Sequence, residues 1–209
     1  AGVRAPAPLI RIGGAMDEIA AILFFTIAAG ACIPLGGFVA SFEHIHSRWM
    51  EQELRHFVIA LGGGILLGAV AIVLVPEGIA SMNGSMLAIP LVLGGGLTFF
   101  VVERALGLRR HGAPQLMGML LDYVPEAIAL GGLIALGSPA AALLALLIGL
   151  QNLPEGFNAF RELHAMGQHS ARRTLLIMWS LVTIGPVAGL GGYFLLADYP
   201  AVLGAIMLF

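Results

Sequence analysis

The chain has 209 residues, of which 59% are hydrophobic and only 11% are charged. A water-soluble domain of this length cannot hide so much apolar surface, so the composition predicts an integral membrane protein. The net charge of −2 argues against a basic nucleic-acid surface, and we expect membrane lipid rather than nucleic acid as a partner. The single cysteine, Cys32, cannot form an internal disulfide.

Apolar stretches of about 20 residues, the length that a helix needs to cross a bilayer, recur along the chain. Six of them lie at roughly 19–42, 57–76, 86–103, 115–137, 140–160 and 174–196. We expect residues 1–18 to form an N-terminal tail outside the cytoplasm and 19–209 to form the membrane domain. A seventh apolar stretch, Pro200 to Phe209, is about half a span, so we expect C-terminal helices to be missing from this sequence. The predicted fold is an all-α polytopic membrane helix bundle with six spans and the start of a seventh.

Arginine residues mark alternate connections between the predicted spans. They follow the first, third and fifth spans, as Arg48 and Arg55, then Arg104, Arg109 and Arg110, then Arg161, Arg172 and Arg173. All six histidines lie in or beside the same connections. The positive-inside rule therefore predicts that these connections are cytoplasmic and that the N-terminus lies outside. We expect an integral protein of a plasma membrane, of the bacterial inner-membrane type.

Three acidic residues, Asp122, Glu126 and Glu155, fall well within the fourth and fifth spans. A carboxylate near the centre of a bilayer costs at least about 2.5–3.5 kcal/mol, so such residues normally face the interior of a bundle, pair with a cation or bind a ligand. No Arg, Lys or His lies inside the predicted spans to pair with them. These carboxylates therefore need a functional explanation.

Two of the spans carry the same polar pattern around a proline. The segments are Asp122-Tyr123-Val124-Pro125-Glu126-Ala127 and Gln151-Asn152-Leu153-Pro154-Glu155-Gly156. In each segment the first residue and the glutamate are four apart, which places both side chains on one face of a helix. Pro125 and Pro154 each leave a backbone carbonyl without its helical hydrogen bond and kink the helix. Paired, interrupted helices with polar groups in the membrane are typical of ion sites in transporters.

The short Ser138-Pro139 connection would bring the two patterns face to face in antiparallel helices. The sequence then predicts an oxygen cage whose metal ligands are Asp122, Glu126, Gln151 and Glu155, with Asn152 alongside. A divalent cation would reduce the formal charge of the cage from −3 to −1. The alternative is a set of protonated or tyrosine-bonded carboxyl groups that stabilise contacts between helices.

At these residues the chain resembles the ZIP (Zrt/Irt-like) family of metal transporters, whose fourth and fifth helices carry His-Asn-x-Pro-Glu-Gly type motifs. The fifth-span segment differs from the common form only at Gln151, so the resemblance implies Gln151, Asn152 and Glu155 as ligands. In the fourth-span segment Pro125 and Glu126 match. Three other positions of that segment depart from the family form, with Asp122 for His, Tyr123 for Asn and Ala127 for Gly. The resemblance implies eight spans and transport of Zn²⁺ or a similar ion towards the cytoplasm.

A second metal position is not expected in this chain. Family members with two metals also use a glutamate before a proline in the sixth span, where this sequence has Gly185 before Pro186. Tyr123 stands where a second ligand from the fourth span would be needed. We therefore expect one principal site.

The ligand set predicts where a divalent ion binds, but it does not single out one ion. Carboxylates and amides without His or Cys suit Zn²⁺, Cd²⁺, Mn²⁺ or Fe²⁺, and the ion is cargo rather than a cofactor. No zinc-protease, nucleophile-elbow or P-loop motif occurs, so we expect neither an enzyme nor an ATP-driven pump. The alternative function is a degenerate relative that senses metal or acts structurally without flux.

Three further features allow open interpretations. Gly64 and Gly68 have the spacing that lets membrane helices approach closely, which makes a homodimer conceivable. Glu77, at the outer end of the second span, either gathers cations at an entrance or is an ordinary solvated helix end. The His44 and His46 pair either accepts an exiting metal or lies at the interface without ligating.

Overall fold

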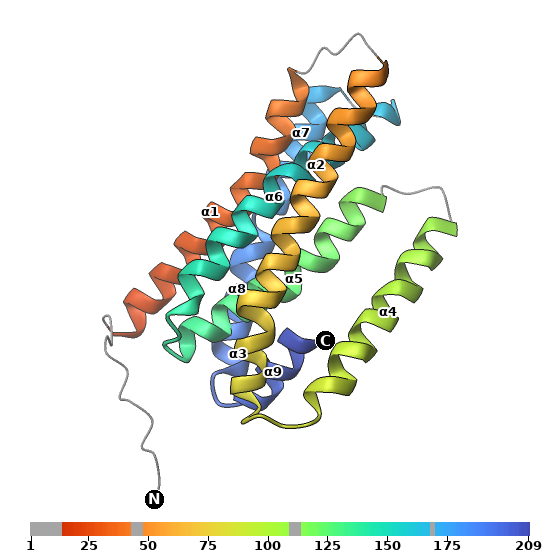
Figure 1. The fold of residues 1–209 in the computed structure, drawn as a ribbon. Helices are drawn as coiled ribbons and strands as arrows, with labels where there is room; N and C mark the ends of the chain where they lie inside the picture. The colour runs from red at the N-terminus through yellow and green to blue at the C-terminus, as the bar shows by residue number, and fades with distance from the viewer. Residues whose placement is uncertain (1–13, 43–47, 109–113, 168–169) are drawn as a thin grey trace, which may run out of the picture.

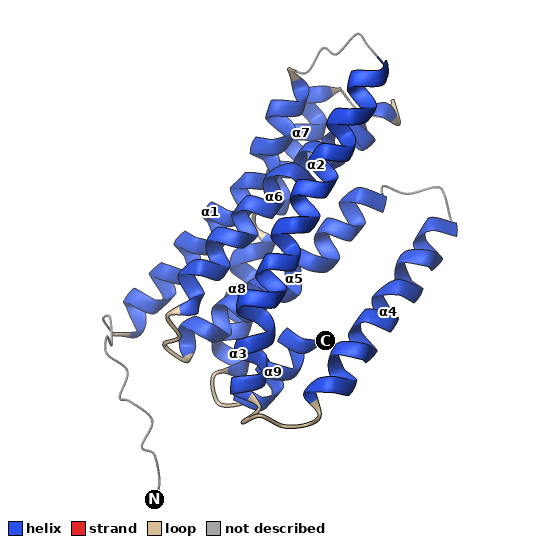
Figure 2. Cartoon of the chain, in the orientation of Figure 1, coloured by secondary structure: helices blue, strands red, loops and turns tan. Residues whose placement is uncertain are grey.

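The computed structural model describes residues 14–42, 48–108, 114–167 and 170–209, and these residues are almost entirely helical, with no strand among them (Figure 2). In chain order the helices are α1 (Ala15–Ser41), α2 (Arg48–Ala69), a π-helical turn η1 (Val70–Leu74), α3 (Val75–Ser81), α4 (Ala88–Leu108), α5 (Pro114–Ala135), α6 (Ala140–Ala165), α7 (Ala171–Leu181), α8 (Ile184–Leu196) and α9 (Pro200–Leu208). The all-α prediction is confirmed for these residues.

Within the described residues, five helical stretches are long and apolar enough to cross a membrane. They are Ala15–Ser41, Glu53–Ser81, Gln115–Ala135, Ala140–Ala165 and Ala171–Leu196. The expected third span forms α4, but its apolar part, Ala88–Val102, is shorter than these five. The structure therefore supports a membrane helix bundle, while the count of six spans remains a prediction.

The N-terminal helix begins earlier than the sequence suggested. Residues 15–18, which we expected in the tail, already belong to α1, and residues 1–13 lie outside the described part of the chain. Asp17 and Glu18 occupy the first turn of α1, where negative charge is favourable beside the unpaired backbone N–H groups. Several of the arginines and histidines used for the orientation also lie outside the described residues, in 43–47, 109–113 and 168–169.

Prolines account for the interruptions in two of the long stretches. Before Pro76 the second stretch widens into η1, where the N–H of Val75 reaches back to the carbonyl of Val70. The sixth predicted span is divided into α7 and α8 by a turn at 182–183. There the ring of Pro186 crowds the carbonyl of Val182, and a proline donates no backbone hydrogen bond. Both interruptions follow from this steric effect.

Helix α6 packs against α1, α2 and α5, as Figure 1 shows. The α1–α6 contact is between backbones, because a Cβ atom added at Gly156 would overlap the carbonyl oxygen of Ile33. Helices α5 and α8 meet in the same way, where a Cβ at Gly131 would overlap the carbonyl oxygen of Gly189. Glycines therefore hold each of the two motif helices tightly against an outer helix.

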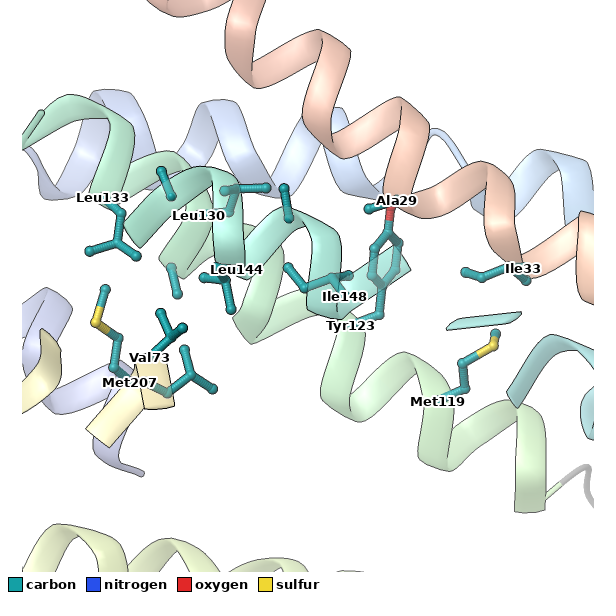
Figure 3. Close-up of a cluster of buried hydrophobic side chains, with 14 of the residues drawn as sticks. Ala29, Ile33, Val73, Met119, Tyr123, Leu130, Leu133, Leu144, Ile148 and Met207 are labelled. Carbon is teal, nitrogen blue, oxygen red and sulfur yellow. The ribbon is translucent and has the colours of Figure 1, made fainter. Parts of the chain in front are cut away.

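Buried apolar side chains fill the bundle between the polar segments and the turn that joins α5 to α6. Leu130 and Leu133 of α5 lie beside Leu144 and Ile148 of α6 in this core (Figure 3). All four side chains are 0–1% exposed. The polar residues of the motif helices are thereby separated from that end of the bundle by a dry layer.

The glycine pair expected to bring helices together has no partner within the described part of this chain. A Cβ added at Gly64 or Gly68 would meet no atom within 4 Å. By contrast, one added at Gly62 would lie 3.2 Å from Pro154, where α2 approaches α6. A role of Gly64 and Gly68 in a homodimer remains a prediction.

Candidate cation site

The centre of the candidate site is a hydrogen-bonded pair that joins α5 to α6. The amide nitrogen Nε2 of Gln151 donates to both carboxylate oxygens of Glu126, at 2.7 and 2.6 Å. Glu126 is 4% exposed and Gln151 is 0% exposed. The structure thus brings together one residue from each predicted pattern, across two helices and in the dry interior.

Two further carboxyl groups lie near this pair. Asp122 and Glu155 both act electrostatically on Glu126, and Asp122 also acts on Glu155. Their side chains are partly buried, one on each motif helix. Three acidic groups therefore share one region of the bundle, where low dielectric strengthens their mutual repulsion.

The side chains are not arranged as a closed metal cage. Among the described residues, no three His, Cys, Asp or Glu side chains form a group that could hold a metal ion. The amide of Gln151 occupies both oxygens of Glu126. The cage of Asp122, Glu126, Gln151 and Glu155 therefore remains a prediction, although its four members lie in one region.

Unpartnered oxygen atoms gather on one turn of α6. Gln151 Oε1, Asn152 Oδ1 and Glu155 Oε2 are buried, and none of them has a hydrogen-bond partner among the described residues. Leaving one buried polar group unsatisfied costs about 1–3 kcal/mol. The proline at position 154 adds a backbone carbonyl, that of Leu150, without its usual helical donor. This turn is the place where a cation would be most favourable.

Asn152 does not face α5 together with Gln151. Its Nδ2 donates to the carbonyl of Ala29 on α1 at 3.0 Å. Consecutive residues of a helix point about 100° apart, so Gln151 and Asn152 cannot both be directed at the same neighbouring helix. Asn152 therefore joins α6 to α1, and only its oxygen is left to contribute to the site.

Tyr123 fills the space beside Gly185. Its hydroxyl donates to the carbonyl of Thr26 at 3.2 Å, and its side chain is 1% exposed. Figure 3 shows the ring pointing from α5 towards Ala29 of α1. Cβ atoms added at Gly30 or Gly185 would overlap this hydroxyl. The phenol therefore occupies the junction of α1, α5 and α8.

Glu77 has a specific contact at the other end of the bundle. Its Oε2 accepts a hydrogen bond from Ser138 Oγ at 3.0 Å, which ties α3 to the turn between α5 and α6. This contact gives Glu77 a structural role as a link between α3 and that turn. It does not support the hypothesis that Glu77 gathers cations at an entrance. His44 and His46 lie outside the described residues.

The sequence analysis missed polar residues that extend the same face of α6. Asn158 and Glu162 follow Glu155 at helical spacing, and both line a cavity beyond the carboxyl groups. The signal was present in the sequence, since Gln151, Glu155, Asn158 and Glu162 are separated by four, three and four positions. Asn158 and Glu162 were overlooked because they lie near the end of the span.

No protein-family model matches the chain, and no curated protein sequence is significantly similar to it.

Proposed function

We propose that the chain transports divalent metal cations across the membrane and that the cation is held between α5 and α6. The observation that carries this proposal is the set of three buried, unpartnered oxygens on one turn of α6, next to the buried carboxylate of Glu126. Ordinary packing does not favour such a group, since each unsatisfied oxygen destabilises the fold. The resemblance of the two proline-glutamate segments to the ZIP family supports the same function.

The donor set matches a divalent cation in both charge and chemistry. Asp122, Glu126 and Glu155 supply negative charge, and Gln151 and Asn152 supply neutral oxygens. A bound cation would satisfy these oxygens together and relieve the repulsion between the carboxylates. Oxygen ligands suit Mn²⁺ and Fe²⁺ as well as Zn²⁺ and Cd²⁺, so the order of preference is a matter for measurement. By resemblance, movement is towards the side that carries the arginine-rich connections.

The test is ion uptake into vesicles that contain the purified chain, with Zn²⁺, Cd²⁺, Mn²⁺ and Fe²⁺ compared. Glu155→Gln keeps the size of the side chain and removes its charge, and we expect it to reduce uptake by roughly tenfold or more. Asp198→Asn makes the same chemical change at an exposed carboxylate after α8, outside the site, and should transport like the native chain.

Two outcomes would contradict the proposal. One is native uptake equal to that of empty vesicles, and the other is saturable uptake that Glu155→Gln leaves unchanged. Stabilisation of the native protein by metal, without flux, would instead favour the sensing function.

A further inference from the structure

The short helix α3 is set off on both sides by irregular backbone. On one side, η1 and Pro76 interrupt the α-helical hydrogen bonds that would continue from α2. On the other side, the connection to α4 turns through Asn83 and Gly84, at φ 53° and 71°. Helices bend at interruptions of this kind, and segments between them move as units. The seven residues of α3 can therefore change position without unfolding α2.

Helix α3 packs mainly against α9, beside it in Figure 1. A Cβ added at Gly78 would lie 2.8 Å from Cγ of Leu208, and one added at Gly204 would lie 2.6 Å from the carbonyl oxygen of Gly78. Contacts this close leave no room for side chains between the two helices, so the backbones themselves meet. We therefore treat α3 and α9 as one packed pair.

An apolar layer next to this pair closes the same end of the bundle. Val73 of η1 and Met207 of α9 are 1% and 7% exposed. They belong to the buried cluster that contains Leu133 and Leu144 of the motif helices (Figure 3). Packed apolar side chains exclude water and ions. The polar groups of the motif helices are therefore reached through this layer only when α3 and α9 move away from α5 and α6.

A hydrogen bond ties α3 to the turn between the motif helices. Ser138 Oγ donates to Glu77 Oε2 at 3.0 Å, and both side chains are partly buried. The same hydroxyl oxygen accepts the backbone N–H of Ala140 at 3.2 Å, so the donor is held in place by its own turn. A hydrogen bond to a carboxylate is stronger than one between two neutral groups. The bond therefore resists movement of α3 away from this end of the bundle.

We propose that the Glu77–Ser138 hydrogen bond is a latch that holds α3 and α9 over this end of the bundle, and that its release lets water enter the apolar layer. The role of the latch rests on the proposed function, since an ion that crosses the membrane has to pass both ends of the bundle. The latch itself is measured without metal or flux.

The test is the rate at which a charged, water-soluble maleimide reacts with a cysteine in the apolar layer, in the whole chain held in lipid nanodiscs. Cys32→Ala removes the native thiol, and Ala141→Cys places the reporter in the buried cluster, at a position that is 6% exposed. In this background we expect Ser138→Ala to raise the labelling rate roughly fivefold. Glu77→Ala should have a similar effect. The double variant Glu77→Ala/Ser138→Ala should label no faster than either single variant, because both changes break the same bond.

Two controls separate the latch from other effects. Ser85→Ala removes a hydroxyl from the connection between α3 and α4 at the same end, where it accepts the N–H of Leu87 at 3.3 Å, and should leave the labelling rate unchanged. Ala40→Cys places a second reporter, also at a position 6% exposed, near the opposite end of the bundle. Ser138→Ala should not change the labelling rate of this second reporter.

Three results would overturn the latch. They are an unchanged labelling rate of Ala141→Cys in the Ser138→Ala variant, independent effects of Ser138→Ala and Glu77→Ala in the double variant, and an equal increase in labelling at Ala40→Cys, which would mean general loosening. Absence of ion uptake by the native chain would instead refute the proposed function and leave the labelling results as they are, so the two failures are distinguishable.

Discussion

The junction at Tyr123 makes a quantitative prediction about Gly185. In Gly185→Ala the new Cβ would overlap the Tyr123 hydroxyl and lie 2.9 Å from Cζ and 3.1 Å from the carbonyl oxygen of Thr26, whereas ordinary contacts run from 3.4 to 4 Å. The ring is 1% exposed, so it can move away only by displacing its packed neighbours. Overpacking of this kind costs about 1–3 kcal/mol, and the better helix propensity of alanine returns up to about 1 kcal/mol. We expect a net destabilisation of about 1–2 kcal/mol.

A double-mutant cycle with Tyr123→Phe tests the cause. The phenylalanine ring lacks the hydroxyl, so Gly185→Ala should cost about 1 kcal/mol less in that background than in the native chain. Tyr123→Phe alone should cost about 1 kcal/mol, because the bond to the Thr26 carbonyl is lost. The assay is reversible unfolding of the four proteins in detergent. Gly191→Ala, on the same helix with nothing within 4 Å of the new carbon, is the control.

Purely additive effects in the cycle would refute this reasoning, because they would mean that the hydroxyl and the new methyl group do not compete for one space. A destabilisation by Gly191→Ala as large as that by Gly185→Ala would refute it as well. In that case alanine would be disfavoured on α8 for reasons unrelated to Tyr123.

Three other changes give independent tests. Gly156→Ala should destabilise the protein by about 1–3 kcal/mol in the same unfolding assay. Gly64→Ala is the control and should be neutral, because its new carbon has no atom within 4 Å. Equal effects of the two changes would contradict the α1–α6 packing. Gln151→Leu removes the donor to the buried Glu126 and should lower the free energy of unfolding by about 2–3 kcal/mol. Most of this loss should be recovered when Glu126→Leu is added. An unchanged unfolding midpoint in Gln151→Leu would argue against the pair. Ser170→Ala removes the side-chain cap of α7 and should raise the rate of amide hydrogen exchange in the first turn of that helix by roughly fivefold. An unchanged exchange rate would show that the cap does not stabilise the helix.

The sequence was sufficient to predict the elements around the site. Residues 115–137 and 140–160 were expected as helices and form α5 and α6, with ends displaced by only a few positions. The facing of Glu126 and Gln151 followed from the four-residue spacing in each segment and from the short connection between them. Local spacing is decisive here because each helix is one uninterrupted stretch that passes close to the other.

Contacts between helices that are distant in the sequence could not be predicted in the same way. Nothing in the segment around Asn152 indicates that its amide binds Ala29, because that contact depends on how closely α1 approaches α6. The close approach depends in turn on Gly36, which lies against the backbone of Leu153, and on Gly156, which lies against that of Ile33, and neither contact can be deduced from the sequence. Tyr123 was recognised as a departure from the family pattern, but its role in the junction of α1, α5 and α8 was not.

The side chain of Gln151 has two chemically different ends, and only one of them is in use. Its nitrogen faces Glu126 while its oxygen has no partner within the described chain. A half-turn about its last bond exchanges the two atoms, so the same residue can donate a hydrogen bond to a buried carboxylate in one orientation and offer an oxygen ligand to a cation beside that carboxylate in the other. At the proposed site an arriving ion would compete with the Gln151 amide for Glu126, and the amide would return to Glu126 when the ion leaves. Rotation about a single bond would thus keep Glu126 partnered whether or not an ion is bound.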